Sequence, residues 1–436
     1  MTDVAVVPPR APFRRLKLEE LKALAASAQT LITKIRDGAI EPNRVKTLRG
    51  IPASEVCRYL GDITIDTLYR RLKKDSDLPQ GTQVTQRRRE FTLAEIHSLQ
   101  RAFNLQPKRP PGQPPLTLSV CNFKGGVAKT TQTAHLAQYL CLMGYRVLVI
   151  DLDAQASLTQ MFGILPHSEV PARQTARPYF EGPGSAEEPN EDWTGTLATA
   201  IQKTHWPQLD LVASNLGLYG AEFSLAARIR NSAVTGESFY YYSVLKSGID
   251  TVKDDYDIVL LDTAPSLSFV NSNALFAADA LLITLPPAPV DVQSASLFYE
   301  LIATVIETFD EYEDFGKAFE FAAILLTKFK PNDQNHQLVA GWIRTYLKDI
   351  CTNPMVQTVV LEKLGVKLLS LYEADPTAES SRYEGGRRAF ERAVESMNDV
   401  NREIEEAIQT VWARKSMTTS EVERFGEIPE AAVAHG

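Results

Sequence analysis

The sequence has few cysteines, and none of them are arranged as a metal site or a disulfide framework. Only four occur in 436 residues, and no two form a C-x-x-C pair. This usage excludes the common zinc-binding motifs and the small disulfide-rich scaffolds. We therefore expect a protein of the reducing cytoplasm.

Long apolar runs are also missing. No stretch approaches the roughly 20 apolar residues that a membrane-spanning helix needs, and residues 1–10 carry no signal-peptide pattern. We expect a soluble protein with no membrane partner. The hydrophobic fraction of 44% and the charged fraction of 23% are ordinary for globular proteins. The length implies two or three domains.

Acidic residues outnumber basic ones in the chain as a whole, which has a net charge of −8, but one segment has the opposite balance. Residues 44–109 contain 14 Lys and Arg against 7 Asp and Glu, whereas the rest of the chain contains 32 against 47. A basic block of this kind is either a solvated face or a surface for the phosphate backbone of a nucleic acid.

Two short helices joined by a tight turn are predicted inside this basic segment, over residues 52–61 and from Thr64 onward. In the second helix, Ile65, Leu68 and Leu72 are expected to face inward. The basic residues of the same helix would then face outward. Such a pair is typical of a helix-turn-helix.

A strand pair over residues 83–91 follows the two helices, and Thr92 with Glu95 predicts a capping box that opens a further helix. This order resembles a winged helix of the MerR kind. An arginine-rich wing suits contact with phosphates or with the minor groove. The candidate DNA-binding residues are Thr67, Arg70, Arg71 and Lys74 on the second helix and Arg87, Arg88 and Arg89 on the wing.

The strongest functional signal is K-G-G-V-A-K-T-T, residues 124–131, between a predicted strand (116–121) and a predicted helix (132–143). Glycines at this point let backbone N–H groups approach a polyphosphate, and the helix directs its positive end there. Lys129 is expected to reach the β- and γ-phosphates, and the Thr130 hydroxyl to bind Mg²⁺. The candidate nucleotide-binding residues are Lys124, Gly125, Gly126, Val127, Ala128, Lys129, Thr130 and Thr131.

This segment departs from the common loop G-x-x-x-x-G-K-[ST], because Phe123 and Ala128 stand at the two glycine positions. Its additional lysine, Lys124, makes it resemble the deviant Walker A motif of the ParA and MinD superfamily. The resemblance implies that Lys124 crosses a dimer interface to phosphates bound by the partner subunit. A homodimer that encloses two nucleotides is therefore expected.

Two further apolar runs end in carboxylates, at Asp151 and at Asp262. Acids at the carboxyl ends of parallel strands lie at the ligand crevice of an open sheet. Residues 151–159, D-L-D-A-Q-A-S-L-T, resemble the second motif of the family, with alanine at 154 and 156 in place of the usual proline and glycine. The resemblance implies that Asp153 holds the attacking water, that Asp151 supports the magnesium shell and that Asp262 meets Mg²⁺. The predicted catalytic residues are Lys124, Lys129 and Asp153, and the predicted metal site is Thr130, Asp151 and Asp262.

The predicted fold class is α/β, a doubly wound and mostly parallel sheet of the deviant Walker P-loop NTPase type. A small winged helix-turn-helix domain and an N-terminal helix precede it. Later strands are expected over residues 209–213, 280–285, 321–327 and 366–371. The expected domains are an N-terminal helix (1–40), a winged DNA-binding domain (41–109), a proline-rich linker (110–115), the ATPase domain (116–412) and an acidic tail (413–436). The apolar seam of the N-terminal helix suits either a dimerisation arm or packing on its own chain.

The domain order resembles that of the RepA proteins of the repABC group. The resemblance implies a cytoplasmic, nucleoid-associated partition ATPase that uses ATP and Mg²⁺ and dimerises on ATP. It further implies nonspecific DNA binding, stimulation by a centromere-binding partner of the ParB or RepB type, and repression of its own operon through the winged domain. One alternative is a transcriptional repressor whose nucleotide site is a sensor with little turnover. Another is an assembly or metal-delivery ATPase, which would bind a client protein and no DNA.

Overall fold

The computed structural model describes residues 17–39, 46–86, 88–166, 169–184, 189–313, 316–375 and 386–416. Contacts divide the chain into two compact units, Met1–Val45 and Lys46–Gly436. In the first unit the described residues form α1 (Leu18–Ala39), whose Leu21, Leu24 and Leu31 are 49%, 59% and 57% exposed. The role of α1 as a dimerisation arm stays a prediction.

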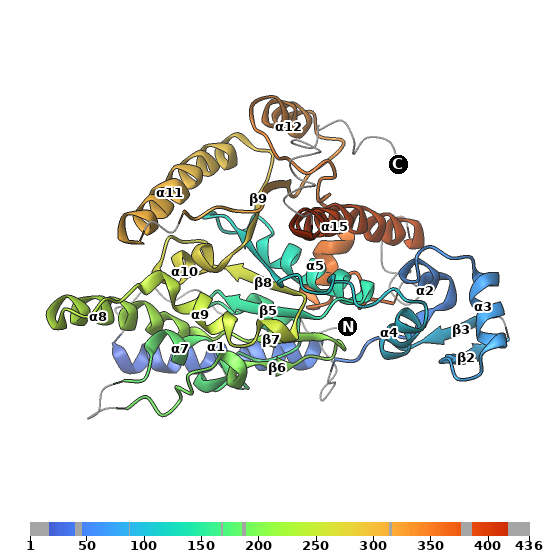
Figure 1. The fold of residues 1–436 in the computed structure, drawn as a ribbon, viewed down its shortest axis with the longest axis horizontal. Coiled ribbons are helices and arrows are strands. Elements are labelled where there is room, and N and C mark those ends of the chain that lie inside the picture. The colour runs from blue at the N-terminus through green and yellow to red at the C-terminus, as the bar shows by residue number, and fades with distance from the viewer. Residues whose placement is uncertain are drawn as a thin grey trace, which may run out of the picture. The chain divides into compact units, whose positions relative to one another are not determined.

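The second unit is built around a seven-stranded sheet (Figure 1). Its strand order is β10-β9-β4-β8-β5-β7-β6, and every neighbouring pair is parallel except β6 with β7. The strands are β4 (Leu116–Cys121), β5 (Val147–Leu152), β6 (Gln202–Lys203), β7 (Leu209–Val212), β8 (Ile258–Thr263), β9 (Ala280–Leu285) and β10 (Ala322–Leu326). The central strands are buried on both faces, which explains why they read as continuous apolar runs.

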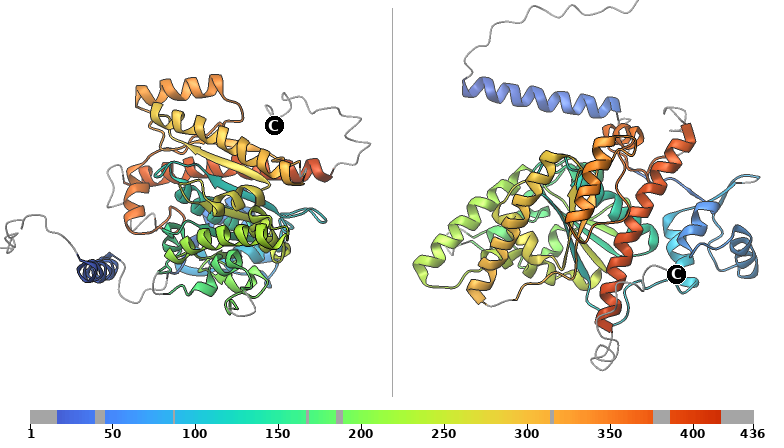
Figure 2. Two further views of the ribbon diagram at one scale, coloured as in Figure 1. Left: turned by 90° about the vertical axis from the view of Figure 1, so that its left-hand side faces the viewer. Right: turned by 90° about the horizontal axis from the view of Figure 1, so that it is seen from above.

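Helices cover both faces of this sheet, as the further views also make visible (Figure 2). Val147 and Val149 of β5 pack on the side of α5 and α15, whereas Leu148 and Ile150 pack on the side of α7 to α10. The helices are α5 (Lys129–Met143), α6 (Ser157–Met161), α7 (Arg177–Glu181), α8 (Tyr219–Thr235), α9 (Val244–Asp250), α10 (Phe269–Ala277), α11 (Pro289–Glu313), α12 (Gln334–Tyr346), α13 (Val359–Val366) and α15 (Gly386–Ser416). Short 3-10 turns are η1 (Ala172–Gln174), η2 (Leu197–Ala200), η3 (Leu216–Leu218), η4 (Tyr241–Ser243) and η5 (Lys253–Asp255). The doubly wound α/β prediction is confirmed.

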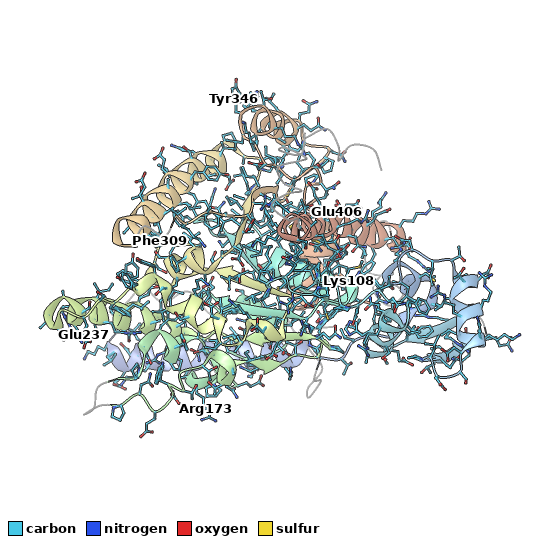
Figure 3. The ribbon with its side chains drawn as sticks, viewed as in Figure 1. Lys108, Arg173, Glu237, Phe309, Tyr346 and Glu406 are labelled. Atoms are coloured by element: carbon cyan, nitrogen blue, oxygen red, sulfur yellow. The ribbon has the colours of Figure 1, made fainter. Side chains whose placement is uncertain are left out.

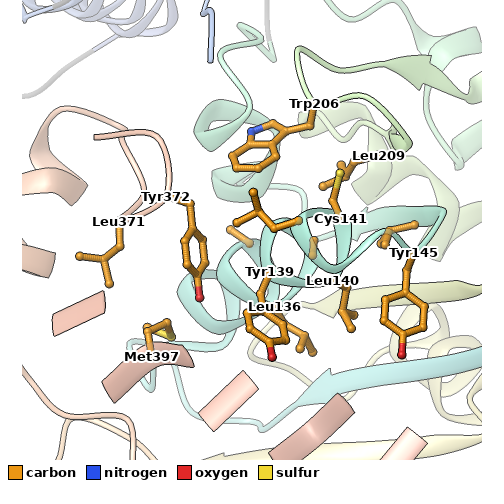
Figure 4. Close-up of a cluster of buried hydrophobic side chains, with 14 of the residues drawn as sticks. Leu136, Tyr139, Leu140, Cys141, Tyr145, Trp206, Leu209, Leu371, Tyr372 and Met397 are labelled. Atoms are coloured by element: carbon orange, nitrogen blue, oxygen red, sulfur yellow. The ribbon is translucent and has the colours of Figure 1, made fainter. Parts of the chain in front are cut away.

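The helix α5 lies at the centre of the largest apolar cluster (Figure 4). Leu136, Leu140 and Tyr145 are fully buried there, and Met397 of α15 reaches the same cluster. Burial of this kind contributes about 1.5–3 kcal/mol for each large apolar side chain. It holds α5, and with it the loop that precedes α5, in a fixed position on the sheet.

The helix α11 is anchored at its far end by an aromatic cluster. Phe309, labelled in Figure 3, is fully buried. Its ring centroid lies 4.5 Å from that of Tyr242 and 5.1 Å from that of Phe276. The first turn of α11 lies beside the loop between β4 and α5, where Asp291 makes the contact described below.

The predicted winged domain consists of three helices and a three-stranded antiparallel sheet of order β1-β3-β2. Its elements are β1 (Ile51–Pro52), α2 (Ala53–Tyr59), α3 (Ile65–Lys74), β2 (Thr82–Thr85), β3 (Arg88–Phe91) and α4 (Leu93–Ala102). The capping box of Thr92 and Glu95 is confirmed. The inward orientation of Ile65 is wrong, because Ile65 is the first residue of α3 and is 41% exposed, whereas Leu68 and Leu72 reach the core.

This small domain is joined to the sheet domain through the C-terminal end of α5. His97 Nε2 lies 2.8 Å from the carbonyl oxygen of Cys141, and Gln100 Nε2 donates to that of Leu142 at 2.9 Å. Burial lowers the pKa of His97 to about 4, so the ring is neutral at neutral pH and donates through Nε2–H. The linker is also held, since Trp412 Nε1 donates to the Pro114 carbonyl oxygen at 3.0 Å.

One predicted strand is wrong. Residues 359–366 form α13, where the Thr358 hydroxyl accepts a hydrogen bond from the Leu361 N–H, and residues 367–371 form turns. Ile350 instead forms a short bridge to Ile324 of β10, and Val356 forms one to Phe329, beyond the end of β10. Within the described residues, no helix is both long enough and apolar enough to cross a bilayer.

Candidate functional site

Residues 122–128 join β4 to α5 at the carboxyl edge of the sheet, and β5 and β8 end beside them. A pocket of about 420 Å³ opens at this edge. It is lined by Gly125, Gly126, Ala128, Lys129, Thr130, Thr131, His135, Asp153, Ser157, Gln160, Met161, Pro265, Leu361, Gly365, Leu368 and Leu369. A volume of this size fits a small ligand, and the carboxyl edge of a doubly wound sheet is where such ligands bind.

The loop has a backbone that turns sharply twice. Gly126 has φ +73° and Ala128 has φ +68°, both in the left-handed region. Asn122 and Thr327 hold the ends of the loop, since Asn122 Oδ1 accepts from the Lys124 N–H at 2.9 Å and Thr327 Oγ1 donates to the Val127 carbonyl oxygen at 3.0 Å. The glycines leave the backbone exposed on the pocket side, as close approach of a polyphosphate requires.

Lys129, Thr130 and Asp262 converge at the start of α5. Thr130 Oγ1 donates to Asp262 Oδ2 at 2.8 Å, and Thr133 Oγ1 donates to Asp262 Oδ1 at 3.1 Å. Lys129 Nζ donates to the carbonyl oxygen of Lys124 at 3.0 Å. Burial lowers the pKa of Lys129 and raises that of Asp262. Burial disfavours the charged form of both groups, and a polyphosphate beside Lys129 or a divalent cation beside Asp262 would offset that cost.

Asp151 and Asp153, two residues apart, are placed differently. Asp151 is fully buried, does not line the pocket, and accepts from the Asp153 N–H at 3.1 Å and from the Thr159 hydroxyl at 2.7 Å. Burial, and next the charge of Asp262, raise its pKa. Asp153 does line the pocket, and its Oδ1 accepts from the Gln155 N–H at 2.9 Å. The structure therefore brings Asp153, and not Asp151, to the cavity.

Lys124 has a partner in its own chain. Its Nζ lies 2.5 Å from Asp291 Oδ1, in the first turn of α11. Lys124 does not line the pocket. The cation predicted to act in a neighbouring subunit is thus held by a carboxylate beside the loop.

The far half of the pocket is apolar. Met161, Leu361, Leu368 and Leu369 line it. His135 also lines this half, but its two nitrogens are occupied: Nδ1 lies 2.7 Å from the Thr131 carbonyl oxygen, and Nε2 accepts from the Leu371 N–H at 3.2 Å. Burial lowers the pKa of His135, so the ring is neutral with the proton on Nδ1. A flat, mostly apolar ring would fit this half of the cavity.

Sequence reasoning missed several residues of the site. Asn122 bonds within the loop, whereas Asp291 of α11 and Thr327 after β10 contact the loop from outside it. Asn271 Nδ2 donates to the Ala264 carbonyl oxygen at 2.8 Å behind the segment that follows β8. Asn122 adjoins the motif and could have been noticed. The others lie far away in the sequence, where no local pattern marks them.

The predicted DNA-binding residues lie on α3 and on the β2–β3 hairpin. Arg70 and Lys74 are exposed, and Arg70 Nη2 donates to Thr67 Oγ1 at 3.2 Å. The Arg71 guanidinium stacks 4.3 Å from the centre of the Phe103 ring. On the hairpin, Arg88 pairs with Glu90 at 2.6 Å and Arg89 lies 5.8 Å from the centre of the Tyr69 ring. Arg87 lies outside the described residues.

Comparison with known proteins places this site in a family context. A model of the AAA domain matches residues 116–313. The chain is 31% identical over 426 residues to a candidate replication protein A of Sinorhizobium fredii, with 94% of this chain and 98% of the relative covered. It is 30% identical over 274 residues to the protein SopA of Escherichia coli K12, covering 62% of this chain and 65% of SopA. A solved structure named a partition protein shares the fold with a TM-score of 0.59 at 18% identity, over 90% of this chain and 98% of that one.

Proposed function

We propose a function that proceeds from one premise: this chain belongs to the family of ParA-type partition ATPases. The chain binds ATP with Mg²⁺ in the pocket beside α5, hydrolyses it, and uses the cycle to segregate a DNA replicon. The observation that carries the proposal is the convergence of Lys129, Thr130 and Asp262 on a loop whose glycines expose the backbone to the same cavity.

The residues present fit a magnesium nucleotide. Backbone N–H groups of residues 125–130 and the N-terminus of α5 would hold the phosphates, and Lys129 would reach them. The Thr130 hydroxyl and Asp262 would hold Mg²⁺. Among the described residues, no three His, Cys, Asp or Glu side chains gather into a metal site of their own, so the remaining ligands would be phosphate oxygens and water. Mg²⁺, when bound, would neutralise negative charge on the phosphates.

Phosphoryl transfer is accelerated mainly by positioning and by cations around the transferring group. Asp153 lines the cavity and is the carboxylate that would orient the attacking water. Asp151 would act indirectly, by fixing the turn that carries Asp153. Lys129 would stabilise the phosphate charge within its own subunit.

Lys124 would supply the missing cation from a second copy of the chain. In the separate subunit its charge is held by Asp291. Closure of an ATP-bound dimer would release Lys124 from Asp291 and place it on the partner's phosphates, so that hydrolysis would depend on pairing.

The winged domain would bind an operator through α3 and the hairpin, with Arg70 and Lys74 as exposed phosphate or base contacts. The ATP-bound dimer would hold DNA without sequence preference in the cytoplasm, on the nucleoid. A centromere-binding protein of the ParB or RepB type would stimulate hydrolysis and release the dimer.

The test is phosphate release by the full chain with Mg-ATP, measured alone, with nonspecific duplex DNA, and with DNA plus the ParB-type protein of the same replicon. We expect slow release that both additions increase, and none from a Lys129→Ala control. Release that neither addition changes would contradict a partition cycle.

A second function has one observation in its favour. The winged domain is bonded to α5 through His97 and Gln100, so a nucleotide sensed at one end of α5 could affect operator binding at the other. A nucleotide-sensing repressor would show nucleotide-dependent, sequence-specific gel shifts and negligible phosphate release under all three conditions.

A further inference from the structure

A largely buried lysine just before β1 contacts the wall of the nucleotide pocket from outside the recognised motifs. The Lys46 side chain is 11% exposed, and its ammonium pairs with Glu373 Oε2 at 3.1 Å. The same Nζ donates to the carbonyl oxygen of Met161 and to that of Leu368, each at 2.5 Å. All three ammonium donors therefore have acceptors, which is the condition for burying a charge at low cost.

Two of these acceptors belong to the wall of the pocket. Met161 is the last residue of α6, and Leu368 lies in the turn after α13. Both line the cavity on its apolar half. The two segments are far apart in the sequence, and Lys46 joins their backbones through a single nitrogen.

The carboxylate that completes the cluster is itself fixed. Glu373 Oε1 accepts from His205 Nε2 at 2.6 Å and from the indole N–H of Trp206, which belongs to the buried cluster of Figure 4. Burial alone would raise its pKa, but the His205 hydrogen bond and the Lys46 charge lower the pKa of Glu373 to about 2. The carboxylate therefore stays ionised and anchors the Lys46 ammonium in one place.

The local backbone leaves room for this arrangement. Gly163 follows α6 with φ +84°, and a Cβ there would come within 3.0 Å of Lys46 Cγ and Cδ. Only glycine accommodates both the left-handed backbone and the close passage of the lysine stem. Gly163 therefore leaves the space through which the Lys46 side chain reaches its three acceptors.

We propose that Lys46 is a positioning residue for the nucleotide, because it holds the Met161 and Leu368 segments of the pocket wall together and so sets the affinity of the site. This deepens the proposed function and rests on it, since the ligand is taken to be ATP. Lys46 lies just before β1, outside the ATPase motifs.

The test compares full-length variants by titration with a fluorescent ATP analogue and by steady-state kinetics. Lys46→Met keeps the length of the side chain and removes the charge and the donors. We expect about tenfold weaker binding and a similarly raised KM, with kcat at saturating ATP within about twofold of wild type. A change in KM alone would indicate a displaced pocket wall, because a general loss of active protein would lower the apparent kcat instead.

Arg49→Met is the matched control. Arg49 pairs with Glu55 of α2 at 2.6 Å in the same segment. We expect this variant to lose thermal stability yet bind the analogue as wild type does. If Lys46→Met fails to fold, the double variant Lys46→Met/Glu373→Gln removes both buried charges and should regain stability while binding weakly.

Wild-type affinity in Lys46→Met or in the double variant would overturn the proposal, provided that the wild-type chain binds ATP and Lys129→Ala does not. Equal weakening in Arg49→Met would overturn it as well, since the effect would then be general. Failure of the wild-type chain to bind ATP would instead overturn the proposed function, and this proposal with it.

Discussion

Asp151 and Asp153 belong to one short motif, yet their surroundings give them separate tasks. Asp151 accepts three hydrogen bonds in a fully buried position, whereas Asp153 borders the cavity. We expect Asp153→Ala to keep ATP binding and wild-type stability but to lose hydrolysis by at least about 100-fold, as general-base or water-orienting groups contribute.

Asp151→Asn provides the comparison. It should lower the free energy of unfolding by about 1–3 kcal/mol, because it disturbs a buried hydrogen-bonded carboxylate. Urea unfolding and phosphate release, measured on both variants, check this division. An Asp153→Ala protein that hydrolyses ATP normally would remove Asp153 from the mechanism.

Two alanines occupy backbone positions that favour glycine. Ala128 has φ +68° and Ala156 has φ +55°, and these are the positions at which the sequence departs from the usual glycine of its motifs. A left-handed alanine costs about 1–2 kcal/mol relative to glycine. Replacing it by glycine recovers only part of this free energy, because glycine loses more conformational freedom when the chain folds. We expect Ala156→Gly to stabilise the protein by about 0.5–1 kcal/mol.

The urea concentration at the midpoint of unfolding measures this effect, and it should rise in Ala156→Gly. Ala303→Gly is the control, in which the midpoint should fall. Ala303 is exposed in the middle of α11, where glycine costs about 1 kcal/mol. A lower midpoint for Ala156→Gly would contradict the assignment of strain at residue 156.

At the scale of elements, α11 presents Asp291 to Lys124. Because the pair is partly exposed, its loss should change stability by less than about 1 kcal/mol. Loss of the pair should affect ATPase activity more than stability, since Lys124 would no longer be held in its own subunit. We expect Asp291→Asn to reach half-maximal ATPase activity at a several-fold lower protein concentration than wild type. An unchanged concentration dependence would mean that Asp291 does not restrain Lys124.

Strands were the most predictable elements, and for a physical reason. β9 is buried along its whole length and β10 over its last three residues, so their apolar runs mark them clearly. The run over 366–371 is also largely apolar, but Val366 ends a helix whose cap at Thr358 was not recognised, and the bridge to β10 is made by Ile350 instead. An apolar run specifies burial, whereas the available partners decide whether it becomes a strand.

The candidate site was predictable in its phosphate half and not in the rest. Lys129, Thr130 and Asp262 follow strands or open a helix, so topology brings them together. The apolar half is assembled from Met161 and Leu368, whose sequence surroundings resemble any packed segment. That half is formed by packing between segments far apart in the sequence, whereas a sequence motif contains only residues that lie close together in the chain.

For the whole molecule, the proposed mechanism depends on pairing, because each ATP would need Lys124 from one subunit and Asp153 from the other. Neither a Lys124→Ala dimer nor an Asp153→Ala dimer then has a complete site. A mixed dimer has one, made of Asp153 from the first variant and Lys124 from the second.

The most direct measurement is therefore phosphate release by an equimolar mixture of the Lys124→Ala and Asp153→Ala proteins, each inactive alone. We predict that mixing restores about a quarter of the wild-type rate, because random pairing makes half of the dimers mixed and each of these has one complete site. A mixture as inactive as its two components would contradict the account.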